Sequence, residues 1–177
     1  MIYTPAEDSF LLEKSVKKYA KNKTFLDMGA GSGIQSEAAL KSWAKSILAT
    51  DIAPESVKIL KSKNIPCIKS DLFENLNNQR FDLIVFNPPY LPQEDREDKE
   101  SREITTGGKK GDEVIMRFLK QAPKHLNKNG DILLIVSSLT PKDRIKKLLI
   151  KLKLECKVID EKRLFFEKLE VWEITRA

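Results

Sequence analysis

Short apolar segments alternate with amphipathic helical segments along most of this 177-residue chain. The expected strands lie at residues 24–28, 46–51, 65–69, 81–86, 131–137, 154–160 and 164–175. The expected helices lie at residues 6–20, 34–43, 54–62, 112–126 and 141–152. Such alternation is typical of an α/β sandwich whose sheet is largely parallel. No helix separates the last two strands, so a closing hairpin should add an antiparallel strand.

Length and composition favour one domain over residues 1–177, large enough to bury roughly 70% of the surface of its unfolded chain. The first residues lack the basic and apolar regions of a signal peptide, and no apolar run approaches a membrane span. Cys67 and Cys156 are far apart, which favours reduced thiols and a cytoplasmic location. His125 is the single histidine, so we expect no metal site and no histidine-based triad.

The charge is unevenly distributed. The net charge is +6, but residues 94–103 hold six acids and three bases, so the other residues together carry +9. This excess suits an acidic or RNA-containing partner, or lysines kept for solubility. The acidic stretch lies in a long polar loop, residues 88–111, of the kind that is usually functional or disordered.

A glycine turn follows the first strand with the spacing Asp27-x-Gly29-x-Gly31-x-Gly33. It differs from the Gly-x-Gly-x-x-Gly turn that wraps a pyrophosphate. An acid two residues before the first glycine opposes a pyrophosphate and favours a ligand with an ammonium or sulfonium group. The pattern therefore favours S-adenosylmethionine over NAD, although a glycine turn by itself also serves simple chain reversal.

Two further acids follow the next strands. Asp51 ends the second strand, where a carboxylate can accept hydrogen bonds from both ribose hydroxyls. Asp71 follows the third strand and suits an adenine amine, with Leu72 against the ring. Each acid alone is as easily a helix cap or turn residue. Together with Asp27 and Asn87 they mark successive strand ends on one edge of the sheet.

The fourth strand runs into Asn87-Pro88-Pro89-Tyr90. The prolines lack N–H groups and restrict the backbone, so the turn is stiff. The side-chain oxygen of Asn87 and the carbonyl of Pro88 can form a clamp that accepts both hydrogens of a planar –NH2 group. Tyr90 can lie against the face of that group. A plain strand-ending turn is the simpler interpretation of these four residues.

Four stretches together resemble one enzyme family: residues 3–12, 27–33, 82–90 and 107–113. The chain resembles the short archaeal and eukaryotic HemK-like glutamine methyltransferases of class 1 translation release factors, within the class I S-adenosylmethionine-dependent superfamily. The resemblance implies a Rossmann-like seven-stranded methyltransferase sandwich, mostly parallel with an antiparallel C-terminal strand. It also implies that residues 1–23 form a helix packing over the cofactor site.

The resemblance assigns roles by position. Ser9 approaches the methionine part of the cofactor, Asp51 holds its ribose, and Asn87 with Pro88 orients the target amide. The residues implied at S-adenosyl-L-methionine are Ser9, Asp27, Gly29, Gly31, Gly33, Asp51, Ile52, Asp71, Leu72 and Asn87. The implied catalytic group is Asn87, Pro88, Pro89 and Tyr90.

The resemblance also implies partners. One is a release factor, methylated on the glutamine of its Gly-Gly-Gln loop, and the other is a small zinc-binding activator along the strand at residues 65–69. The alternative substrate is the exocyclic amine of adenine, because the clamp fits either –NH2 group. The acidic half of the loop argues against direct nucleic-acid binding. A non-catalytic cofactor-binding module is the third interpretation.

Overall fold

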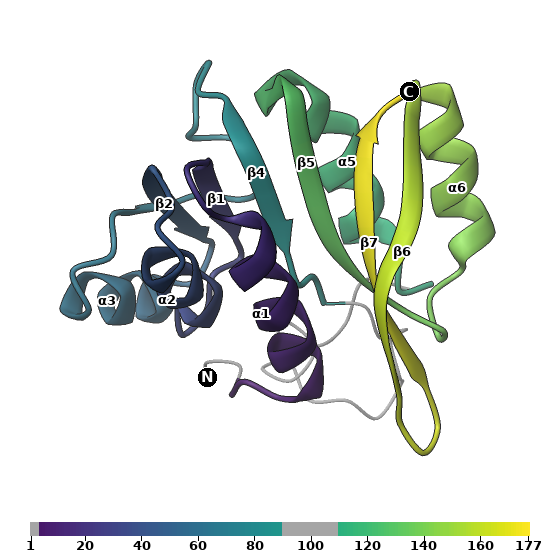
Figure 1. Cartoon of the computed structure of the whole chain (residues 1–177), viewed down its shortest axis with the longest axis horizontal. Coiled ribbons are helices and arrows are strands. Elements are labelled where there is room, and N and C mark those ends of the chain that lie inside the picture. The colour runs from purple at the N-terminus through teal and green to yellow at the C-terminus, as the bar shows by residue number, and fades with distance from the viewer. Residues whose placement is uncertain (1–3, 90–109) are drawn as a thin grey trace.

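The computed structural model of the chain describes residues 4–89 and 110–177. Within them one sheet has the strand order β3-β2-β1-β4-β5-β7-β6 (Figure 1). The strands are β1 (Thr24–Met28), β2 (Ser46–Asp51), β3 (Cys67–Lys69), β4 (Phe81–Phe86), β5 (Leu126–Ser137), β6 (Leu154–Arg163) and β7 (Lys168–Arg176). The helices are α1 (Glu7–Tyr19), α2 (Ile34–Lys41), α3 (Pro54–Ser62), α5 (Glu113–His125) and α6 (Lys142–Lys151).

The strand directions confirm the expected α/β fold. β1 pairs in parallel with β2 and β4, β2 with β3, and β4 with β5. β7 runs antiparallel to β5, and β6 runs antiparallel to β7. The sheet is therefore a Rossmann-like, mostly parallel sheet whose antiparallel pairing is confined to its C-terminal strands, as the sequence predicts.

Alternate residues of β4 face two layers of helices, because side chains along a strand point to opposite faces. Ile84 and Phe86 pack in the apolar cluster formed with α5 and α6. Leu83 and Val85 pack in the cluster formed with α1 and α2. Figure 1 shows α1 and α5 on opposite sides of the sheet. Burial on both faces explains why β4 reads as an almost continuous apolar run.

β5 begins directly after α5, at Leu126, which is earlier than the start expected at residue 131. The pairing of β4 with β5 shifts register here, from Phe81↔Leu126 to Leu83↔Asp131. A Cβ atom on Gly130 would lie 3.1 Å from the carbonyl oxygen of Phe81. Glycine therefore lets the irregular start of β5 approach β4 closely.

Phe10 does not face the core, although its spacing in the sequence suggests that it does. Its side chain is 51% exposed, and Leu11, Leu12 and Val16 form the buried face of α1 instead. Phe10 lies six residues before Val16, about 240° away around the helix, whereas Leu12 lies four residues before Val16 and shares its face.

Asp112 precedes α5 but makes no side-chain capping hydrogen bond. Its fully buried carboxylate accepts a 2.9 Å hydrogen bond from Nη1 of Arg144 on α6. Asp112 therefore forms an ion pair that ties α5 to α6. His125 has a packing role, because its buried ring stacks on Phe73 at a centroid distance of 4.6 Å.

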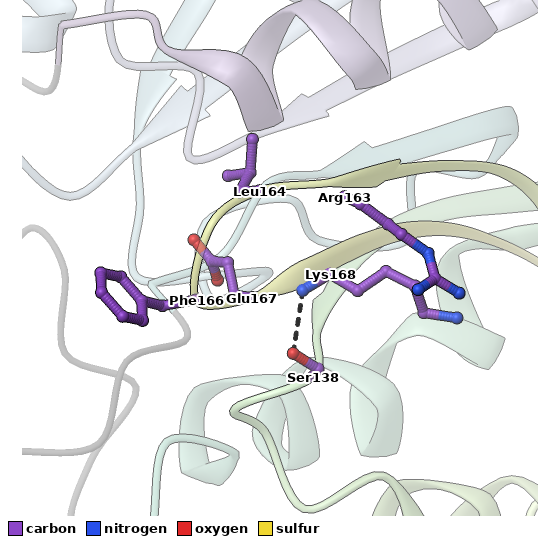
Figure 2. A pocket seen from close by; sticks show the side chains of 6 residues that line it. All are labelled: Ser138, Arg163, Leu164, Phe166, Glu167 and Lys168. Carbon is purple, nitrogen blue, oxygen red and sulfur yellow. Dashed lines mark hydrogen bonds between the residues drawn. The ribbon is translucent and has the colours of Figure 1, made fainter.

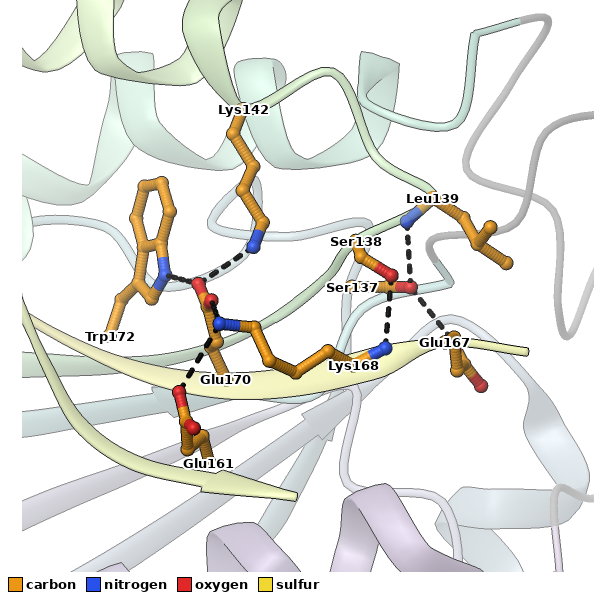
Figure 3. Close-up of polar contacts among 9 residues, drawn as sticks. All are labelled: Ser137, Ser138, Leu139, Lys142, Glu161, Glu167, Lys168, Glu170 and Trp172. Atoms are coloured by element: carbon orange, nitrogen blue, oxygen red, sulfur yellow. Dashed lines mark hydrogen bonds and ion pairs between the residues drawn. The ribbon is translucent and has the colours of Figure 1, made fainter. Parts of the chain in front are cut away.

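A polar network fixes the base of the β6–β7 hairpin (Figure 3). The buried carboxylate of Glu170 accepts hydrogen bonds from Nε1 of Trp172 at 2.8 Å and from Nζ of Lys142 at 2.8 Å, and Nζ of Lys168 lies 2.7 Å away. The two lysines and the indole outweigh the effect of burial and lower the pKa of Glu170 to about 2. The network joins α6 to β7.

Candidate functional site

The carboxyl ends of the parallel strands bring the predicted polar residues to one edge of the sheet. Met28 on β1 pairs with Thr50 on β2 and with Phe86 on β4, and Asp51 pairs with Lys69 on β3. Asp27, Asp51 and Asn87 consequently lie at or next to the ends of three adjacent strands. Ligands bind at this edge in open α/β sheets, particularly where the strand order reverses, as it does here between β1 and β4.

The glycine turn between β1 and α2 has an open side and a packed side. Gly31 has φ +52°, and a Cβ atom there would meet no atom within 4 Å. Gly33 has φ +86°, and a Cβ atom there would lie 2.9 Å from Cδ2 of Leu60. Both positions need glycine for their backbone conformation. Gly33 lets α2 approach α3, whereas Gly31 leaves space for a ligand.

Asp51 is held in a fixed orientation by backbone donors. Its Oδ2 accepts from the N–H of Gly31 at 2.8 Å, and its Oδ1 accepts from the N–H of Ala53 at 2.8 Å. A carboxylate oxygen can accept more than one hydrogen bond, so both oxygens keep acceptor capacity for hydroxyl groups of a ligand. Ile52 lies beside Asp51 with its side chain 61% exposed.

Asp27 is buried, and its Oδ2 accepts from both N–H (2.9 Å) and Oγ (2.7 Å) of Ser36 in the first turn of α2. Burial raises the pKa of Asp27 to about 7, although the two bonds from Ser36 oppose the shift. The carboxyl group therefore changes its charge near neutral pH. The sequence predicts the acid but not its attachment to α2.

Asp71 and Leu72 follow β3 as expected, but both have partners in the protein. Oδ2 of Asp71 accepts a 2.8 Å hydrogen bond from Nη2 of Arg117 on α5. Leu72 has φ +49°, and its side chain is buried in the cluster beneath α5. Arg117 is absent from the predicted site, since its contact with Asp71 spans 46 residues of sequence.

Asn87 lies next to α1. Its Nδ2 is 3.4 Å from Oγ of Ser9, and its Oδ1 is buried with no hydrogen-bond partner among the described residues. Pro88 is buried and Pro89 is half-buried, whereas Tyr90 lies outside the described residues. An acceptor that is buried without a donor costs free energy unless a ligand supplies the donor.

Gln35 is a further residue of this site that sequence reasoning missed. It is 4% exposed in the first turn of α2, and its Nε2 donates a 2.9 Å hydrogen bond to the carbonyl oxygen of Ser9. Its Oε1 is also buried without a partner in the described part of the chain. The available signal was a polar residue on the apolar face of a short helix, next to Ala38 and Ala39.

These groups fit a ligand rich in N–H and O–H donors. Asn87 and Gln35 each present a buried oxygen that has no partner among residues 4–89 and 110–177, Asp51 keeps acceptor capacity, and Gly31 leaves room beside them. S-adenosylmethionine has an ammonium group, ribose hydroxyls and an adenine amine, so the residues present fit that cofactor.

A hollow of about 350 Å³ lies at the tip of the β6–β7 hairpin (Figure 2). It is lined by Ser138, Arg163, Leu164, Phe166, Glu167 and Lys168. The tip is closed by a 2.8 Å hydrogen bond from the N–H of Leu164 to the carbonyl oxygen of Glu167. None of the predicted site residues lines this hollow, so we place the candidate site at the strand ends described above.

Residues 4–89 and 110–177 hold no group of three or more histidine, cysteine or acidic side chains placed to bind a metal ion. In the same residues, each helix is too short or too polar to cross a membrane.

The sequence matches the family model described as Methyltransferase small domain over residues 7–166. A Methanocaldococcus jannaschii protein, named as a protein N5-glutamine methyltransferase by inference, is 42% identical over 156 residues, which cover 83% of this chain and 78% of that protein. Methyltransferase HEMK2 of Mus musculus is 32% identical over 73% of this chain and 68% of its own length. A release factor glutamine methyltransferase of Rhodopirellula baltica is 35% identical over 64% of this chain and 44% of its own length.

Solved structures share the fold. Mtq2 of E. cuniculi, determined in a complex with Trm112, superposes with a TM-score of 0.80 at 24% identity and covers 99% of both chains. The ribosomal protein L11 methylase of Lactobacillus delbrueckii subsp. bulgaricus superposes with a TM-score of 0.73 at 24% identity, over 99% of this chain and 82% of that one.

Proposed function

Because the chain belongs to the methyltransferase small domain family and to its HemK-like glutamine methyltransferases, we propose that it methylates a glutamine side chain. The proposed donor is S-adenosyl-L-methionine. The proposed substrate is the glutamine of the Gly-Gly-Gln motif in a class 1 release factor. The observation that carries the proposal is the buried Oδ1 of Asn87, directly after β4, which has no hydrogen-bond partner in the part of the chain that the structure describes.

Asn87 and Pro88 accept the two hydrogens of the target amide. The Oδ1 of Asn87 takes one hydrogen and the backbone carbonyl of Pro88 takes the other, which fixes the plane and the direction of the nitrogen. Amide nitrogen is a weak nucleophile because its lone pair is delocalised, and both hydrogen bonds raise its electron density. The nitrogen gains its methyl group and loses one of these hydrogens as a proton, which passes to solvent.

When bound, the cofactor supplies an electrophilic methyl group on a sulfonium. The protein's contribution is placement, since correct orientation of two reactants is worth roughly 7–11 kcal/mol of barrier. Asp51 accepts from the ribose hydroxyls, and Asp27 in its charged form favours the cationic end of the cofactor. Asp71, oriented by Arg117, faces the adenine amine.

The N-terminal helix completes the site. Ser9 on α1 contacts both Gln35 and Asn87, which supports a role for the N-terminal segment as a cover over the cofactor. The continuous sheet supports a single domain over residues 1–177. Substrates that act in translation would place the protein in the cytoplasm.

The edge of the sheet at β3 supports an activator partner. β3 pairs only with β2 among the described strands, and the N–H of Ser70 and the carbonyl of Pro66 both bond to β2. Because successive residues of a strand alternate their hydrogen bonds, the N–H of Lys69 faces away from β2. A partner strand can add there. Mtq2 of E. cuniculi is described as a complex with Trm112 responsible for the methylation of eRF1, and we expect a similar small zinc-binding partner.

The test is transfer of a tritiated methyl group to purified release factor and, separately, to oligonucleotides, each with and without the activator. We expect labelling of the release factor at its glutamine. Labelling of adenine would establish the alternative substrate, since the same clamp fits its amine. Cofactor binding without labelling of either would indicate a non-catalytic module.

A further inference from the structure

We propose that Gln35 and Asp8 are positioning residues that act through Ser9 on Asn87 and keep the Asn87 oxygen available to the substrate amide. The inference rests on the proposed glutamine methylation and adds Gln35, which lies outside the four stretches that resemble the family, and a role for Asp8. Four residues fix each other's hydrogen-bonding direction: Asp8 and Ser9 on α1, Gln35 on α2, and Asn87 after β4.

Gln35 joins α2 to α1. Its Nε2 donates to the carbonyl oxygen of Ser9 at 2.9 Å, and both residues are almost fully buried, with 4% and 2% exposure. A backbone carbonyl can only accept, so this contact fixes the Gln35 amide with its nitrogen toward Ser9. The contact also fixes the first turn of α1 against the start of α2.

Asp8 determines the direction of the Ser9 hydroxyl. Its Oδ1 accepts from the N–H of Ser9 at 2.6 Å and lies 3.3 Å from Oγ of Ser9. In this contact the Ser9 hydroxyl donates and Oδ1 of Asp8 accepts. The oxygen of that hydroxyl then faces Asn87 as an acceptor.

The orientation of Asn87 follows from this chain of donors and acceptors. Nδ2 of Asn87 lies 3.4 Å from Oγ of Ser9, because an acceptor attracts the N–H groups of the amide and not its oxygen. The Oδ1 of Asn87 is consequently turned away from Ser9 and remains without a partner among the described residues. That free oxygen is the acceptor required to hold the substrate amide.

Gln35 is poorly explained by packing alone. It shares a buried helix face with Ala38 and Ala39, where apolar residues suffice. The unpaired Oε1 of Gln35 adds a desolvation cost that an apolar side chain of similar size would avoid. A residue retained at such a cost is more consistent with a function than with stability.

The test compares Gln35→Met, which keeps the volume and removes the donor, with wild type and with the control Gln121→Met. Gln121 is on the opposite helical layer, where its Nε2 bonds to the carbonyl of Arg117. With release factor and activator present, we expect Gln35→Met to lower kcat about tenfold, the effect of one lost hydrogen bond. We expect Tm within about 2 °C of wild type and the Kd for S-adenosylhomocysteine within about threefold.

A double-variant cycle separates action through Ser9 from a general structural effect. If Gln35 acts through Ser9, kcat of the double variant Gln35→Met, Ser9→Ala equals that of Ser9→Ala alone. Independent losses that multiply would overturn the proposal. So would a wild-type kcat in Gln35→Met, or a loss confined to Tm. Ser9→Thr, which keeps the hydroxyl, should retain far more activity than Ser9→Ala.

A binding measurement distinguishes failure of this inference from failure of the proposed function. A Gly-Gly-Gln peptide of the release factor is titrated into the S-adenosylhomocysteine complex of each variant. Weaker binding to Gln35→Met than to wild type supports the inference, and equal binding contradicts it. If wild type neither binds nor methylates the release factor, the proposed function itself has failed.

Discussion

The N–H of Gly31 donates a 2.8 Å hydrogen bond to Oδ2 of Asp51, which links the glycine turn after β1 to the end of β2. This contact holds the carboxylate at the edge of the sheet while the open side of Gly31 leaves space next to it. Two strand ends thereby form one surface for a ligand.

Asp51→Ala should weaken cofactor binding first. It removes the proposed acceptors for the ribose and leaves the N–H groups of Gly31 and Ala53 without their partner. Isothermal titration should show a Kd for S-adenosylmethionine at least about tenfold higher than in wild type, the cost of about one lost charged hydrogen bond. The exposed Asp143→Ala serves as the control. An unchanged Kd in Asp51→Ala would exclude the ribose role.

Asn87→Ala should lower turnover much more than it lowers cofactor affinity, the reverse of Asp51→Ala. Turnover should fall by about 100-fold or more, the usual effect of removing a preorganised hydrogen-bonding group, with cofactor affinity within a few fold of wild type. A methylation assay beside a calorimetric titration separates these quantities. Asn129→Ala, an exposed substitution near the amino end of β5, should leave both unchanged. Full activity of Asn87→Ala would refute the clamp.

Cofactor affinity should depend on pH through Asp27. Burial raises the pKa of this carboxyl from 3.8 to about 7, so it is largely neutral at pH 6 and largely charged at pH 8. The negative form attracts a cationic ligand, and the Kd for S-adenosylmethionine should fall by up to about tenfold across that interval. Asp27→Asn should abolish the dependence. The same raised pKa means that Asp27 costs the folded state stability as pH rises from about 4 to 7.

Glu170 should stabilise the folded state as pH rises, whereas Asp27 destabilises it. Its pKa is lowered from 4.5 to about 2, so its stabilising contribution is complete above about 4.5 and is lost as pH falls toward 2. Glu170→Gln should reduce the free energy of unfolding at pH 7 by about 1–3 kcal/mol and weaken this acid dependence. Denaturant titrations at several pH values measure both. Glu155→Gln on neighbouring β6 is the exposed control, and an equal effect there would contradict the role of the network.

Lys69→Pro should prevent the activator from binding. The substitution removes the outward N–H of β3 but no hydrogen bond to β2, so the sheet itself should persist. Co-purification of the two proteins measures the association. Lys69→Ala is the matched control and should bind normally, because it keeps the N–H. Binding of Lys69→Pro at wild-type strength would place the partner elsewhere.

The sequence predicts the order and type of the elements because their apolar patterns are strong. The failures occur where packing between distant elements decides the outcome. Gly130 reads as a turn in sequence but allows close approach of β5 to β4. Asp112 reads as a cap but pairs with Arg144, which lies 32 residues later.

In the site, too, local patterns predict some residues, and packing between distant elements decides others. Asp51 and Asn87 are predicted because they follow apolar strands whose carboxyl ends must meet at one edge. Gln35 and Arg117 are missed because their contacts, with Ser9 and Asp71, depend on how helices pack against that edge. No local pattern in the sequence specifies such a contact.

Mass spectrometry of release factor treated with the enzyme, its activator and S-adenosylmethionine tests the clamp most directly. Wild-type enzyme should add one methyl group to the glutamine of the Gly-Gly-Gln motif, and Asn87→Ala with the cofactor still bound should add almost none. Equal methylation by both proteins, or a methyl group on another residue, would contradict the account.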